Sequence, residues 1–292
     1  MGMGKRRRSP AWKMELDDLI RGACGGFLFG IPLLYTMEVW WIGSFIRPPM
    51  MILAIAVMFV IVFLLNRTAG FRQVQDINVL ESAMDSVEVI ALGFLCTALV
   101  LALLGEIDRQ TPLDEGVGKL IYESVPFTLG VALANQFLSG DRSNNSASSR
   151  STAKSTRPGE LHATLSDIGG TLIGSTIIAA SIAPTDEVDL VASALSAPRL
   201  LALIGVSLMI SYAIVFEAGF ANQQRRMQQK GIFQRPDSET LIAYLVSLIA
   251  AAFMLCFFQQ LGFDDPWTSW LRYTLVLGLP ATVGGAAGRL AV

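Results

Sequence analysis

Three glutamates lie inside apolar runs of this sequence, where an acidic side chain is most able to do chemistry. Glu123 lies about two turns into one run, Glu88 about one turn into another, and Glu38 near the end of the first run. An unpaired charge is costly in hydrocarbon, so acids at such depths suggest a pathway or a binding site for a proton or cation. Glu123 is the deepest of the three and the strongest candidate.

Two less specific explanations of Glu123 remain open at this point. Lys119 precedes it by one helical turn and could form an ion pair with it. Glu123 could also lie at a water-exposed mouth of the bundle. Glu38 stands near Trp40 and Trp41, which are typical of an aromatic belt at a membrane surface.

The pattern Pro-x-Thr-x-Gly-x-Ala occurs twice, starting at Pro126 and at Pro280. A proline within a helix removes one backbone hydrogen bond and frees a carbonyl group. In a membrane that carbonyl needs another donor, such as a hydroxyl, a neighbouring helix or water. We expect two broken helices that line a cavity with Thr128 and Thr282. The alternative is a pair of kinks whose small residues serve packing only.

The overall composition assigns these residues to a membrane protein. Of the 292 residues, 52% are hydrophobic and 16% are charged, and the mean hydropathy is +0.52. Soluble domains carry about 25% charged residues, so a soluble enzyme is excluded. The net charge of −2 provides no field for nucleic acid. The cysteine and histidine spacings fit no metal site, and no cofactor motif is present.

Eight apolar runs are long enough to cross a bilayer core of about 30 Å as helices. They cover residues 19–42, 49–65, 86–104, 117–138, 161–183, 198–216, 240–261 and 267–290. The sequence therefore predicts an all-α, polytopic membrane helix bundle with eight transmembrane helices and the lipid bilayer as its surroundings.

Polar segments divide the chain into predicted parts. A basic N-terminus covers 1–18, and a Ser-rich linker without periodicity covers 139–159. Between and after them lie two units of four spans each, 19–138 and 160–292.

The distribution of basic residues predicts the orientation. With both termini in the cytoplasm, 17 of the 22 Lys and Arg residues fall on the cytoplasmic side. The predicted outer loops carry acids instead, among them Asp108, Asp186 and Glu187.

The two units resemble each other in sequence. Four landmarks recur in the same order at slowly rising offsets of 144 to 154 residues: the Gly-Gly-x-Leu-x-Gly segments at 25–30 and 169–174, Pro49 and Pro198 with their Ala-Gly-Phe closings, Asp85-Ser86 and Asp237-Ser238, and the two proline patterns. A duplicated unit of four spans predicts parallel repeats, because an even number of spans re-enters the membrane from the same side.

Glycines of the first landmark predict close helix packing. Gly26 and Gly30, and likewise Gly170 and Gly174, lie four residues apart on one helix face. Small residues at this spacing let two membrane helices approach closely.

The chain also resembles a known family. The segment Asp17–Trp41 (DDLIRGACGGFLFGIPLLYTMEVWW), the Ala-Gly-Phe closings and Pro126–Asn135 (PFTLGVALAN) are similar to a family of uncharacterised bacterial integral membrane proteins. The resemblance implies a location in the bacterial inner membrane. It implies no catalytic or binding residues.

Three functions follow from these patterns as hypotheses. The first is a transporter or channel for a cation or proton, with its pathway between the two repeats. The second is a membrane enzyme acting on a lipid-like substrate through Asp108, Asp186 and Glu187, although their spacing matches no catalytic motif. The third is a membrane sensor or assembly protein that transports nothing.

Overall fold

The computed structural model describes residues 11–69, 79–138, 160–217 and 236–291. All regular elements within these ranges are helices: α1 Ala11–Leu34, α2 Met37–Phe45, α3 Pro48–Ala69, α4 Val79–Leu104, α5 Leu113–Leu138, α6 Glu160–Ile182, α7 Glu187–Ala194, α8 Ala197–Tyr212, the π-helix η1 Ala213–Glu217, α10 Pro236–Phe257 and α11 Trp267–Ala291. The predicted linker 139–159 and the first ten residues of the predicted basic N-terminus lie outside the described residues.

Five helices are long and apolar enough to cross a membrane: α3, α4, α5, α10, and α8 together with η1. The pairs α1–α2 and α6–α7 are each sharply bent, and they raise the number to seven if each pair forms one span. The described structure therefore supports an all-helical membrane protein with five to seven candidate spans. The eighth predicted span corresponds to α11, whose Gly, Thr and Arg residues leave it less apolar than the other long helices.

The first predicted span, 19–42, is two helices rather than one. α1 ends at Leu34, and α2 begins at Met37 after a bend of 88°. The Thr36 hydroxyl donates to the carbonyl oxygen of Leu33 at 2.7 Å. Such a side-chain bond within the last turn competes with continuation of the helix.

A second bend of the same kind follows α6. The chain turns by 91° between α6 and α7, within a stretch predicted as an outer loop. Here the Thr185 hydroxyl donates to the carbonyl oxygen of Ile182 at 2.6 Å. Both bends thus combine a helix end with a threonine that bonds the carbonyl three residues earlier.

Close glycine contacts join α1 to α5. A Cβ atom added at Gly25 would lie 2.6 Å from the carbonyl oxygen of Gly130, and one at Gly26 would lie 3.1 Å from Val131. A Cβ atom at Gly30 would overlap the ring of Phe127. Only glycine therefore permits this approach of the two helices.

A similar contact joins α6 to α11. A Cβ atom added at Gly284 would lie 2.6 Å from the carbonyl oxygen of Gly174, and one at Gly288 would overlap the carbonyl oxygen of Gly170. All four glycines singled out in the sequence analysis thus lie at, or directly beside, these two helix contacts.

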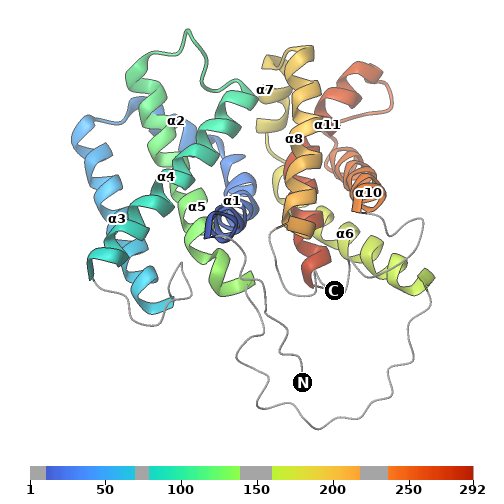
Figure 1. The fold of residues 1–292 in the computed structure, drawn as a ribbon. Coiled ribbons are helices and arrows are strands. Elements are labelled where there is room, and N and C mark those ends of the chain that lie inside the picture. Colours follow the sequence, from blue (N-terminus) through green and yellow to red (C-terminus); the bar gives the residue numbers. More distant parts are fainter. Residues whose placement is uncertain (1–10, 70–78, 139–159, 218–235, 292) are drawn as a thin grey trace, which may run out of the picture.

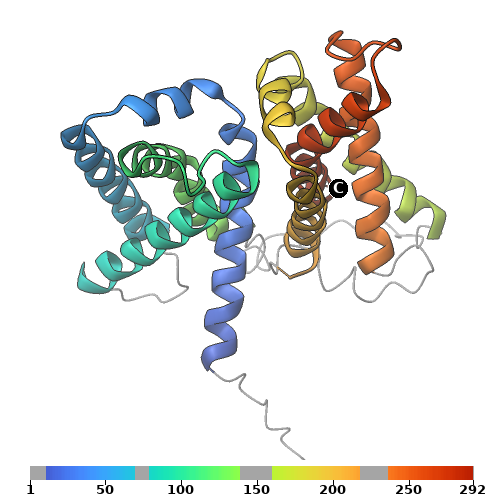
Figure 2. The same ribbon diagram turned by 90° about the horizontal axis from the view of Figure 1, so that it is seen from above.

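The helices form two groups, α1–α5 and α6–α11, which lie side by side (Figure 1) and remain separate in the view turned by 90° (Figure 2). Where the groups meet, they share one apolar core. Its members come from both groups and include Leu34, Tyr35, Leu101, Leu104, Val191, Leu195 and Val276. Packing of apolar side chains therefore holds the two groups together.

Candidate functional site

Glu123 lies in α5 about three turns from the start of the helix. Its side chain is wholly buried, with 0% exposure. Neither carboxyl oxygen has a hydrogen-bond partner in the described part of the chain. Ionising a carboxyl group in such surroundings is costly unless a partner compensates it, so Glu123 is suited to carrying a proton or binding a cation.

Two contacts on the same face of α5 indicate where Glu123 points. Lys119, Glu123 and Phe127 are spaced by four residues and therefore share one helix face. The backbone of Lys119 touches α2, since a Cβ atom added at Gly43 would lie 2.8 Å from the Lys119 Cα. One turn beyond Glu123, the ring of Phe127 covers Gly30 of α1. Glu123 therefore faces the bend that joins α1 to α2.

Lys119 does not pair with Glu123. Its ammonium group lies 2.9 Å from a carboxyl oxygen of Glu115 and 3.3 Å from one of Glu106. Both partners precede Lys119 in the sequence, whereas Glu123 follows it. The ion pair considered in the sequence analysis is therefore absent among the described residues. The complete burial of Glu123 likewise disagrees with a water-exposed mouth.

Trp40 of α2 provides a second buried polar atom in this region. Its side chain is 3% exposed, and its indole Nε1 has no acceptor among the described residues. Trp41, by contrast, is 64% exposed. The two tryptophans therefore do not act alike as the aromatic belt that their adjacent positions in the sequence predict. The spacing in the sequence distinguishes the two tryptophans. Trp40 lies three residues before the packed Gly43 and therefore shares its helix face, whereas Trp41 does not.

The two prolines lie inside continuous helices, Pro126 in α5 and Pro280 in α11. The described chain breaks at the two bends instead. Pro280 has no amide hydrogen for the carbonyl of Val276, four residues earlier. The Tyr35 hydroxyl from the end of α1 donates to that carbonyl at 2.9 Å. Tyr35 therefore supplies the outside donor that a proline in a membrane helix requires.

Thr128 and Thr282 have different surroundings. Thr282 donates to the carbonyl of Gly278 in its own helix at 2.6 Å. The Thr128 hydroxyl is buried without a partner in the described chain. It lies against Gly93 of α4, where an added Cβ atom would overlap it. Thr128 therefore faces a neighbouring helix of its own group.

The other two glutamates lie on different elements. Glu88 is half-buried on α4. Glu38 falls in the first turn of α2, and its side chain lies outside the described part.

Glu38 belongs to a pattern that the sequence analysis missed. Thr36-x-Glu38-Val39 stands at the first bend, and Thr185-x-Glu187-Val188 stands at the second, 149 residues later. This is also the offset between Pro49 and Pro198. Extending the comparison of the halves a few residues before those prolines would have revealed the pattern.

The acids of the predicted outer loops form no metal site, since the described residues contain no group of three His, Cys, Asp or Glu side chains able to hold a metal ion. Asp108 is exposed, and it accepts hydrogen bonds from the backbone N–H of Gln110 and the hydroxyl of Thr111. These bonds hold the pKa of Asp108 below its usual value. Asp186 directly precedes α7, and Glu187 in its first turn is buried. Asp108 thus stabilises its own loop.

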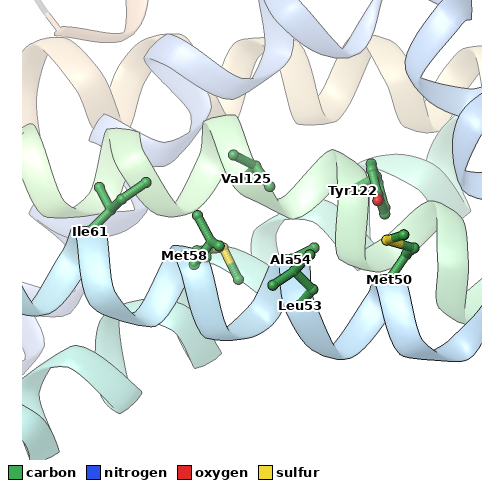
Figure 3. A pocket seen from close by; sticks show the side chains of 8 residues that line it. Met50, Leu53, Ala54, Met58, Ile61, Tyr122 and Val125 are labelled. Atoms are coloured by element: carbon green, nitrogen blue, oxygen red, sulfur yellow. The ribbon is translucent and has the colours of Figure 1, made fainter.

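A groove of about 300 Å³ lies between α3 and α5. Figure 3 shows Tyr122 and Val125 of α5 opposite side chains of α3 such as Met58 and Ile61. Its lining is apolar except for the Tyr122 hydroxyl, and no acid contributes to it. Tyr122 and Glu123 project about 100° apart around α5, so this groove is separate from the Glu123 region.

Comparison with known proteins identifies a family and no more. Residues 18–292 match the model of the family described as "Putative integral membrane protein (DUF2391)". No curated protein and no solved structure matches the chain. Because the match covers nearly the whole sequence, the chain belongs to the DUF2391 family of integral membrane proteins, whose function is uncharacterised.

Proposed function

We propose that this protein moves a proton or a small cation across the membrane and that Glu123 binds the ion during transport. The observation that carries the proposal is the burial of the Glu123 carboxyl group without any hydrogen-bond partner among the described residues. A buried acid of this kind in a membrane helix costs stability, and a role in binding an ion explains its presence. Glu38 and Glu88 remain secondary candidates for the same pathway.

The proposal includes eight membrane crossings, arranged as two parallel repeats, with both termini on the cytoplasmic side of a bacterial inner membrane. The limited apolarity of α11 fits a central position, because its residues 275–286 are all buried and need no contact with lipid. The matching bends after α1 and α6 support a duplication, as does the pairing of α1 with α5 and of α6 with α11.

The binding step belongs, in this proposal, to the interior of the first group of helices. The sequence alone predicts a pathway between the two repeats. The groups share an apolar core where they meet, whereas Glu123 faces the bend within its own group. An ion would reach Glu123 along that bend, where α1 ends and α2 begins.

The test is an ion-flux measurement on the purified full chain in proteoliposomes. Glu123→Gln keeps the size of the side chain and removes its ability to ionise, so flux should be abolished. Glu81→Gln, an exposed residue in the first turn of α4, is the matched control and should transport normally. Absence of flux of protons, Na⁺ or K⁺ from the wild-type protein would contradict the proposal.

A second candidate is a membrane sensor or assembly protein that transports nothing. The apolar core shared by the two groups favours it, because a packed contact needs no pathway. The flux measurement separates the candidates. Wild-type protein that folds but carries no ion would support the second.

A further inference from the structure

We infer that Glu123 and Trp40 together form a proton site at the α1–α2 bend, with Glu123 as the group that takes the proton and the Trp40 indole N–H as the donor that positions it. This inference rests on the proposed function and narrows its substrate to the proton. Trp40 binds no ion by itself, because its N–H does not ionise at physiological pH.

The packing of α1 and α2 against α5 brings the two residues into the same region. Gly43 of α2 lies against Lys119 of α5, and Gly30 of α1 lies against Phe127, so the bend between Gly30 and Gly43 passes beside the stretch of α5 from Lys119 to Phe127. Trp40 lies one turn from Gly43 toward the bend. Glu123 lies in the middle of that stretch of α5, one turn from Lys119 and one turn from Phe127.

The unsatisfied atoms of the two residues are complementary. The indole Nε1 of Trp40 is a donor without an acceptor, and the Glu123 oxygens are acceptors without a donor. In the proposed site, the indole N–H donates to a Glu123 oxygen, directly or through one bridging water molecule, and this bond satisfies both residues. Buried polar groups that lack partners cost free energy, so this pairing explains why both are tolerated in the core.

The same set of atoms disfavours a metal cation. A metal ion would need several oxygen ligands, and the residues that bracket Glu123 are Gly30, Gly43 and Phe127, whose side chains provide none, so every further protein ligand from them would have to be a backbone carbonyl. An indole N–H directs positive charge toward the site and would repel the metal. A proton, in contrast, needs one carboxyl oxygen, and the other oxygen can still accept from Trp40.

The titratable groups of the neighbouring elements leave Glu123 as the one that takes up the proton. On α5 and in the loop before it, Lys119 is paired with Glu106 and Glu115. From α1, Tyr35 donates to the Val276 carbonyl. On α4, Cys96 lies beside Gly26, 3.9 Å from a Cβ atom added there and one turn further from the bend than Gly30, while Asp85 and Glu88 precede Cys96 by two to three turns of the helix. The stretch Pro48–Asn66 of α3 contains no titratable residue. On α2, the side chain of Glu38 is outside the described part.

The experiment combines infrared spectroscopy with proton flux on the full chain in lipid vesicles. At neutral pH, wild-type protein should show the C=O band of a protonated carboxyl group. The band should vanish in Glu123→Gln and persist in Glu81→Gln. In Trp40→Phe it should move to higher frequency, because the C=O loses a hydrogen bond, and proton flux should fall about tenfold. Trp41→Phe is the matched control and should change neither.

Failure of the inference and failure of the proposed function give different results. Na⁺ or K⁺ flux without proton flux, abolished by Glu123→Gln, would retain transport and refute the proton. Unchanged flux and an unshifted band in Trp40→Phe would refute the role of Trp40. A carboxyl band that behaves as expected in a protein without any flux would retain the site and refute transport.

A measurement on Trp40 itself covers the case in which Trp40→Phe does not fold. The indole N–H signal of Trp40, recorded by NMR in nanodiscs, should move between wild type and Glu123→Gln, while that of Trp41 should not. An unmoved Trp40 signal would overturn the inference.

Discussion

At the residue scale, a buried carboxyl group without a partner lowers the stability of the protein that carries it. Leaving a buried polar group unsatisfied costs about 1–3 kcal/mol. The offset of 154 residues aligns Glu123 with Leu277, which is also wholly buried. An apolar side chain therefore suits such an environment, and Glu123 departs from what packing alone would favour.

Glu123→Leu alone should lower the free energy of unfolding by about 1–3 kcal/mol, because it leaves the Trp40 N–H buried without an acceptor, whereas Glu123→Leu combined with Trp40→Phe removes both polar groups and should restore the lost stability. Glu123→Leu should abolish ion flux at the same time. Thermal unfolding in detergent micelles measures the first effect, and proteoliposome flux measures the second. A double variant that is as unstable as Glu123→Leu alone would show that Trp40 is not the partner of Glu123.

At the element scale, the bond from Tyr35 to Val276 links the bend of the first group to the proline helix of the second. This side-chain hydrogen bond replaces a backbone hydrogen bond that is missing from α11. The proline removes the donor within α11, and a side chain from α1 takes its place.

Tyr35→Phe should therefore destabilise the protein by about 1–3 kcal/mol, because it leaves the Val276 carbonyl buried and unpaired. In the background of Pro280→Ala, which restores an amide at that position, the same change should cost only about 0.5 kcal/mol. Unfolding of the four proteins of this double-mutant cycle in mixed micelles gives the coupling.

Tyr122→Phe is the control for this cycle. Tyr122 lines the apolar groove between α3 and α5, so its hydroxyl should matter little. Equal costs of Tyr35→Phe in both backgrounds would contradict the replacement of a backbone bond.

The glycine contacts make a second prediction at this scale. Gly174→Ala would force a methyl group onto the carbonyl oxygen of Gly284 and should cost about 1–3 kcal/mol of unfolding free energy. Gly205→Ala in α8, where an added Cβ atom meets nothing within 4 Å, should change it by less than about 0.5 kcal/mol. Thermal unfolding of the two variants side by side tests the difference. Equal effects of the two substitutions would mean that α6 and α11 can move apart to accommodate the added methyl group.

At the scale of the whole molecule, the distribution of Lys and Arg predicts the topology. In a background in which the three native cysteines are replaced by alanine, Arg109→Cys in the exposed loop after α4 should react with an impermeant thiol reagent in intact cells. Ser146→Cys, in the predicted cytoplasmic linker, should react only after permeabilisation. The opposite pattern would invert the proposed orientation.

Helix positions could be predicted because they depend on local apolar runs. The predicted span 267–290 corresponds to α11, Trp267–Ala291, and the run 86–104 lies within α4, Val79–Leu104. The bends could not be predicted in the same way. The run 19–42 is apolar apart from a few residues such as Arg21 and Glu38, and its break depends on where the Thr36 hydroxyl bonds and on how α2 packs against α5.

The sequence by itself determined that this is a membrane helix protein and that Glu123 is the acid deepest in an apolar run, because both follow from composition and spacing. Only the tertiary structure decided the partners. Lys119 bonds Glu106 and Glu115 rather than the glutamate one turn away, and Tyr35 reaches a carbonyl 241 residues distant. Such choices depend on which helices meet, and no local pattern encodes them.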